Sequence, residues 1–105
     1  MRLLLVDDEA LARERLRALL AGEARYQVVG EADSGEACLA QVGRLKPDVV
    51  LLDIRMPGMD GIETARHLAT LDAPPAVIFV TAFDAFAVAA FDAQAVGYLL
   101  KPVRG

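Results

Sequence analysis

The feature that most constrains the fold of this chain is a regular alternation of short apolar runs with stretches of helical periodicity. Short continuous apolar runs are typical of strands that are covered on both faces. Apolar residues three and four positions apart are typical of helices that pack on a core. The order that results is β-α-β-α-β-α-β-α-β. Strands are predicted at 3–6, 26–32, 47–53, 75–82 and 96–100, and helices at 10–20, 33–45, 60–71 and 84–94.

Strands that alternate with helices have few ways to pack together. Successive strands join through right-handed crossovers into a parallel sheet, and the helices then cover both of its faces. At 105 residues there is room for one such domain. We therefore predict an α/β fold with a doubly wound, five-stranded parallel sheet. A fifth helix would normally follow the last strand, and we expect it to be absent from this chain, which stops at residue 105.

Two of the predicted helices begin with a capping pair. Asp33 precedes Glu36 by three positions, and Asp60 precedes Glu63 by the same spacing. In such a pair the first side chain accepts a hydrogen bond from a backbone N–H of the first helical turn. Asp33 and Asp60 are therefore the predicted N-caps.

Charge and composition argue against several functions. A net charge of −4 disfavours direct binding of nucleic acid, which needs a basic surface. No apolar run approaches the roughly 18 residues of a membrane span, and the run at the start is too short for the ~7–15 apolar residues of a signal peptide. We expect a cytoplasmic protein. Cys38 is the only cysteine, so it can form no intramolecular disulfide, and we expect it in the core.

Charged and hydroxyl side chains stand at the carboxyl ends of the predicted strands, where open α/β sheets bind their ligands. The first strand runs into Asp7 and Asp8, the third into Asp53, the fourth into Thr81 and the fifth into Lys101. Taken singly, each has an ordinary interpretation as a turn residue, a helix start or a strand residue. Together they predict three carboxylates, a hydroxyl and an ammonium group at one edge of the sheet.

Neighbouring carboxylates repel one another unless a cation lies between them. Oxygen ligands suit a hard divalent ion such as Mg²⁺, which often shares its coordination with a phosphate. An aspartate oxygen can then attack phosphorus. Thr81 and Lys101 are suited to supply a hydrogen-bond donor and a positive charge to the phosphoryl oxygens. The pattern indicates phosphoryl transfer onto an aspartate.

The segments that carry this pattern resemble the receiver domain of bacterial two-component response regulators. They are "LLLVDDE", "VVLLDIRMPGMDG", "VTA" and "YLLKP", and they span the whole chain. The resemblance implies a flavodoxin-like (CheY-like) sheet with strand order 2-1-3-4-5. It also implies that Asp53 accepts a phosphoryl group from a sensor histidine kinase, in a signalling domain and not in an enzyme that turns over an external substrate.

The resemblance further assigns a metal site. It implies Mg²⁺ (or Mn²⁺) held by the side chains of Asp8 and Asp53 and by the backbone carbonyl of Arg55, with Asp7 acting through metal-bound water. Asp53 would thus be both metal ligand and phosphoacceptor.

A switch is implied by the same resemblance. Thr81 would be the switch hydroxyl and Tyr98 the switch aromatic, while Lys101 would pair with the phosphoryl group. Phosphorylation would then shift the face formed by the fourth helix and the fifth strand, and this face could support a homodimer.

A narrower resemblance concerns "DDEALARERLRALL" and "TAFDAFAVAAFDAQAVGYLLKPV". These segments resemble receivers that precede a LytTR-type DNA-binding domain, in particular those of the alginate regulator group. Residues 1–105 would then be the receiver of a transcription regulator whose DNA-binding domain is not in this chain. A stand-alone receiver that signals through protein contacts is the alternative.

Two other classes share part of the pattern. An aspartate-nucleophile phosphatase would carry a second aspartate two positions after the nucleophile, where this chain has Arg55. A flavin-binding flavodoxin-like protein would need a hydroxyl- and glycine-rich loop after the first strand, where this chain has three acids. These differences argue against both the phosphatase and the flavin-binding protein.

Overall fold

The computed structural model describes residues 1–81 and the strand at 97–100. The predicted helix at 84–94 lies outside the described residues. The remaining predicted elements are all present, with ends that differ by up to two residues from the sequence-based bounds. They are β1 (Arg2–Val6), α1 (Ala10–Leu20), β2 (Gln27–Ala32), α2 (Gly35–Leu45), β3 (Val49–Leu52), α3 (Gly61–Ala69), β4 (Ala76–Thr81) and β5 (Gly97–Leu100).

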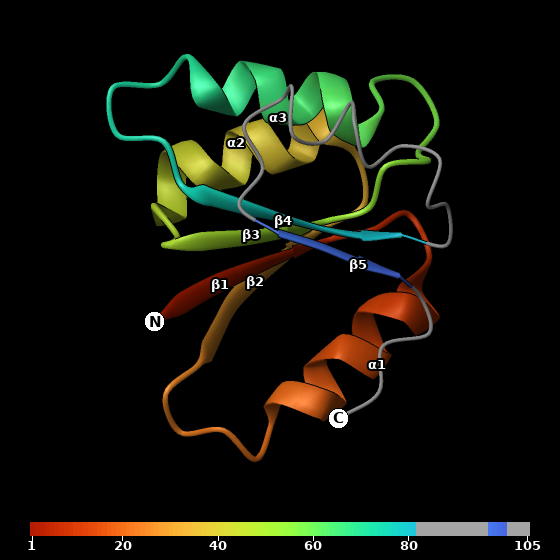
Figure 1. Ribbon diagram of the computed structural model, residues 1–105, viewed down its shortest axis with the longest axis vertical. Helices are drawn as coiled ribbons and strands as arrows, with labels where there is room; N and C mark the ends of the chain where they lie inside the picture. Colours follow the sequence, from red (N-terminus) through yellow and green to blue (C-terminus); the bar gives the residue numbers. More distant parts are fainter. Residues whose placement is uncertain (82–96, 101–105) are drawn as a thin grey trace.

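The five strands form one parallel sheet in the order β2-β1-β3-β4-β5. Figure 1 shows α2 and α3 on one face of this sheet and α1 on the other. The doubly wound, flavodoxin-like order predicted from the sequence is therefore confirmed. β1 and β3 lie at the centre of the order, and their carboxyl ends point to the same edge.

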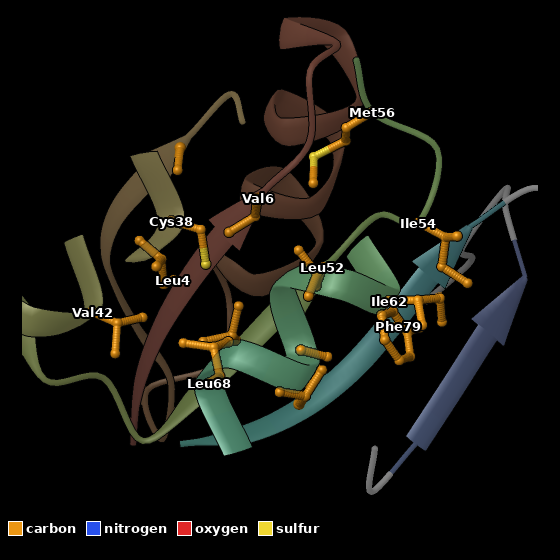
Figure 2. Close-up of a cluster of buried hydrophobic side chains, with 14 residues drawn as sticks. Leu4, Val6, Cys38, Val42, Leu52, Ile54, Met56, Ile62, Leu68 and Phe79 are labelled. Atoms are coloured by element: carbon orange, nitrogen blue, oxygen red, sulfur yellow. The ribbon is translucent and has the colours of Figure 1, made fainter. Parts of the chain in front are cut away.

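Side chains alternate between the two faces of the central strands, which explains why those strands are apolar throughout. In β1, Leu4 and Val6 belong to the core under α2 and α3, whereas Leu3 and Leu5 belong to the core under α1. Figure 2 shows the first of these cores, which includes residues from the sheet, both helices and the loop after β3. Its labelled members are Leu4, Val6, Cys38, Val42, Leu52, Ile54, Met56, Ile62, Leu68 and Phe79.

Cys38 is fully buried in this core, as predicted. Burial away from water disfavours the thiolate and raises the pKa of Cys38 to about 12. The thiol is thus an unreactive part of the packing.

One predicted helix cap is wrong and the other is confirmed. The N-cap of α2 is Ser34, whose hydroxyl oxygen accepts from the N–H of Ala37 at 3.1 Å, and not Asp33. The chain stays extended through Ser34, so the helix begins one residue later than the acidic pair suggested. Asp60 caps α3 as predicted, because its Oδ1 accepts from the N–H of Glu63 at 2.8 Å.

No helix within the described ranges combines the length and the apolar character that crossing a membrane requires.

Candidate functional site

The acidic residues that follow β1 and β3 meet at the carboxyl edge of the sheet. Val6 pairs with Leu52 in parallel register, so the next residues, Asp7 and Asp53, leave the two central strands side by side. One carboxylate oxygen each from Asp7, Asp8 and Asp53 lies within 4.8 Å of the other two. The structure thus brings together the three acids that the sequence placed at strand ends.

Backbone hydrogen bonds hold two of these acids in place. The N–H of Asp53 donates to the carbonyl of Val6 at 2.9 Å, and the N–H of Asp7 donates to the carbonyl of Ala32 at 3.1 Å. The sheet ladder therefore continues one residue past each strand and carries both aspartates with it.

The side chains of Asp7 and Asp53 are oriented by donors that follow them in the chain. Oδ1 of Asp7 accepts from the N–H of Glu9, and Oδ1 of Asp53 accepts from the N–H of Ile54, both at 2.9 Å. Both donors are backbone N–H groups just beyond the strands, so each carboxylate is oriented by the segment that follows it in the chain.

The three carboxylates differ in exposure. Asp7 is 1% exposed and Asp53 is 5% exposed, whereas Asp8 is open to solvent. Two buried carboxylates and a third one close by are costly without a compensating positive charge. Their oxygen donors and their spacing fit a hard divalent cation such as Mg²⁺.

The loop between β3 and α3 packs tightly behind Asp53. The N–H of Gly61 donates to the carbonyl of Ile54 at 2.7 Å. A Cβ at residue 61 would overlap the carbonyl oxygen of Asp53 and would lie 2.7 Å from the Cα of Ile54. Only glycine allows α3 to begin this close to the acidic site. Sequence reasoning missed this role, although the second glycine of "GMDG" is its signal.

Thr81 ends β4 at the same edge of the sheet. Phe79 pairs with Leu52, so Thr81 stands two positions further along, just past the level of Asp53. Its side chain is fully buried, and its Oγ1 has no hydrogen-bond partner within the described part of the chain. A buried hydroxyl without a hydrogen-bond partner costs about 1–3 kcal/mol. This cost would be removed if a ligand with an acceptor oxygen bound beside Thr81.

Two predicted site residues cannot be compared with the structure. Leu100 pairs with Thr81, so β5 reaches the same edge. Lys101, which follows it in the sequence, and the side chain of Tyr98 lie outside the described residues. Arg55 is described, and its side chain is exposed in the loop after Asp53.

A pocket of about 490 Å³ lies at the opposite edge of the sheet, beside the amino ends of β3 and β4. Most of its lining is aliphatic or proline, and the acids on it, Asp48 and Asp72, are not among those whose oxygens converge. The chemistry that the sequence predicts is at the carboxyl edge and not in this pocket.

With this geometry established, comparisons with known proteins decide the family. The sequence profile of the response regulator receiver domain matches residues 3–105. The chain belongs to this family. Receiver domains are signalling modules of two-component response regulators that work with histidine kinases and output domains, and their acidic pocket binds Mg²⁺. The flavodoxin and phosphatase alternatives are not supported.

Individual relatives agree with this assignment. The receiver domain is 56% identical to a positive alginate biosynthesis regulatory protein of Pseudomonas aeruginosa, over 99% of this chain and 42% of that protein. It is 42% identical to the sensory transduction protein LytT of Bacillus anthracis, over 97% of this chain and 42% of that protein. The chain thus spans less than half the length of these relatives.

A solved structure agrees in fold. A crystal structure of the CheX–CheY–BeF3–Mg+2 complex from Borrelia burgdorferi matches 99% of this chain and 80% of that chain, with a TM-score of 0.91 and 25% identity. The resemblance to receiver domains that the sequence motifs suggested is therefore confirmed.

Proposed function

We propose that Asp53 is the phosphoacceptor of this receiver domain and takes its phosphoryl group from a phosphohistidine of a sensor histidine kinase. The observation that carries the proposal is the convergence of Asp7, Asp8 and Asp53 at the ends of two adjacent strands. In the transfer, a carboxylate oxygen of Asp53 forms a bond to phosphorus, the bond from phosphorus to the histidine nitrogen breaks, and the imidazole leaves.

The residues around Asp53 fit Mg²⁺ or Mn²⁺. We assign the side chains of Asp8 and Asp53 and the carbonyl of Arg55 as ligands, with Asp7 acting through metal-bound water. The exposure of Asp8 and the burial of Asp7 are consistent with these different roles. When bound, the ion supplies positive charge to the phosphoryl oxygens.

Protein donors complete the proposed site. Oδ1 of Asp53 accepts from the N–H of Ile54, which orients the carboxylate for attack. The hydroxyl of Thr81, which has no hydrogen-bond partner among the described residues, would donate to a phosphoryl oxygen. Lys101 would add a positive charge to the same group. These contacts also let the domain promote its own phosphorylation and dephosphorylation.

Phosphorylation would operate a switch. The modification adds about −1.5 to −2 charges and three acceptor oxygens, which would attract Thr81 and allow Tyr98 to change position. The populations of the conformations available to residues 84–94 and β5 would then shift. We propose that this part of the chain supports a homodimer.

We propose a DNA-binding output domain of the LytTR type, carried C-terminal to this receiver in a longer regulator. The proposal rests on 56% identity to an alginate biosynthesis regulatory protein of which this chain covers 42%. A receiver that signals through protein contacts alone remains the second candidate, because the acidic site serves either output.

Intact mass spectrometry tests the phosphoacceptor. The chain is incubated with Mg²⁺ and acetyl phosphate, and we expect one added phosphoryl group. The gain should vanish in Asp53→Asn and in the presence of a metal chelator. Asp33→Asn is the matched control, because Asp33 is an exposed acid directly after β2. Phosphorylation that persists in Asp53→Asn would contradict the proposal.

A further inference from the structure

We infer that Arg13 is a positioning residue for the acidic site, whose guanidinium holds the peptide unit between Asp7 and Asp8 in the orientation that a metal ion requires. The inference rests on the proposed metal site and deepens it. Arg13 lies in the first turn of α1, and it is not among the residues assigned to the site above.

Two hydrogen bonds define the contact. Nη1 of Arg13 donates to the backbone carbonyl of Asp7 at 2.6 Å, and Nε donates to Oε1 of Glu31 at 2.8 Å. The Arg13 side chain is only 18% exposed. A planar, partly buried guanidinium that bonds two acceptors in this way has little freedom to move. It therefore connects α1 to β2 and to the end of β1.

The carbonyl that Arg13 holds belongs to the peptide unit that joins Asp7 to Asp8. Because that unit is planar, fixing its carbonyl also fixes the direction in which the chain enters Asp8. On the other side, Oδ1 of Asp7 accepts from the N–H of Glu9. The segment that presents both carboxylates is thus held from two directions, which matters most for the exposed Asp8.

Glu31 keeps Arg13 in place, and its second partner, Arg17, supplies a matched control. Its Oε2 accepts from Nε and Nη2 of Arg17 at 2.9 and 2.7 Å. The hydrogen bond from Arg17 and that from Arg13 both lower the pKa of Glu31, against the opposing effect of burial, so the carboxylate stays charged at neutral pH. The hydrogen bonds found for Arg17 end at Glu31, whereas Arg13 also reaches the Asp7 carbonyl.

Charge and position predict opposite results for the loss of Arg13. Removing a cation near three carboxylates should tighten the binding of a divalent ion by Coulomb attraction alone. Loss of positioning should weaken it, because partners that orient metal ligands typically contribute 10–100-fold to metal affinity. The direction of the change therefore separates the two explanations.

The experiment measures the Kd for Mn²⁺ by electron paramagnetic resonance in the unphosphorylated chain, with circular dichroism to show that each variant is folded. We expect Arg13→Ala to raise the Kd about tenfold and Arg17→Ala to change it less than about twofold. Arg13→Lys keeps the charge but lacks the planar guanidinium that donates to two acceptors at once. We therefore expect it to restore only part of the affinity for Mn²⁺. It also serves as the test if Arg13→Ala does not fold.

Unchanged or tighter Mn²⁺ binding in Arg13→Ala, or equal weakening in Arg17→Ala, would overturn the inference while leaving the proposed function intact. Full restoration by Arg13→Lys would overturn the role given to the planar guanidinium, since a single ammonium donor would then suffice. A wild-type chain without saturable Mn²⁺ binding would contradict the proposed metal site itself.

Discussion

Asp7 and Asp8 are neighbours in the chain but have different environments. Asp7 is buried with its carboxylate held by a backbone N–H, and Asp8 is exposed beside it. Together with Asp53, they place three like charges within 4.8 Å of one another. At the scale of single residues, we expect repulsion between these charges to lower the stability of the metal-free chain, and this can be measured.

Replacing Asp8 by Asn should stabilise the metal-free chain. Each of its two carboxylate neighbours repels it by about 1 kcal/mol even at the dielectric constant of water. The two repulsions together exceed the ~0.3–1 kcal/mol that an acid gains near the start of a helix. We expect the melting temperature in chelator to rise by about 4 °C. In saturating Mg²⁺ the order should reverse, because the wild type gains more from binding.

Differential scanning calorimetry checks this prediction, with Asp72→Asn as a control because Asp72 is an exposed acid outside the cluster. A lower melting temperature for Asp8→Asn in chelator would show that repulsion within the cluster is negligible.

At the scale of secondary structure elements, the site depends on how closely α3 follows β3. The sheet ladder carries Asp53 past the end of β3, and the loop then returns so that Gly61 packs on the Asp53 backbone. The side chains of Ile54 and Met56 are buried in the core and anchor the loop that joins β3 to α3. Asp53, the proposed phosphoacceptor, is thus held by a strand on one side and a helix start on the other.

Gly61→Ala should destabilise the chain by about 3 kcal/mol, because the added methyl group meets backbone atoms that cannot move without shifting the strand end or the helix. Urea unfolding measures the change in the free energy of unfolding. Gly43→Ala is the matched control: Gly43 lies inside α2 with no atom within 4 Å of an added Cβ, so alanine should stabilise the helix by up to ~1 kcal/mol. Equal effects of the two changes would refute the packing argument.

At the scale of the whole molecule, β5 lies at one edge of the sheet. The proposed switch links Thr81 to this outer strand, because Thr81 of β4 pairs with Leu100 of β5. A change at Thr81 can therefore reach the face where we propose a homodimer, and a dimer is what paired DNA half-sites require.

Phosphorylation should accordingly increase the dimer fraction of the chain. Sedimentation velocity before and after treatment with acetyl phosphate and Mg²⁺ measures this fraction, and we expect no response from Asp53→Asn. A dimer that forms to the same extent without treatment, or in Asp53→Asn, would contradict this prediction. Association of the chain would then be independent of phosphorylation.

The sequence by itself determined the order of the elements, the class of sheet and the edge at which the acids gather. These follow from local signals: apolar runs mark the strands, and Asp7, Asp8 and Asp53 come directly after two of them. Because parallel strands end at one edge, the convergence of these residues needed no knowledge of side-chain contacts. The motifs were also sufficient to indicate the family.

Only the tertiary structure decided how that edge is built. The burial of Asp7 beside an exposed Asp8, the close packing of Gly61 on Asp53 and the bond from Arg13 to the Asp7 carbonyl join residues that local patterns do not relate. Even the N-cap of α2, Ser34, was ambiguous in the sequence, because Asp33 beside it fits a cap equally well. The physical reason is that burial and hydrogen bonding depend on which elements pack together, whereas periodicity and residue type describe one element at a time.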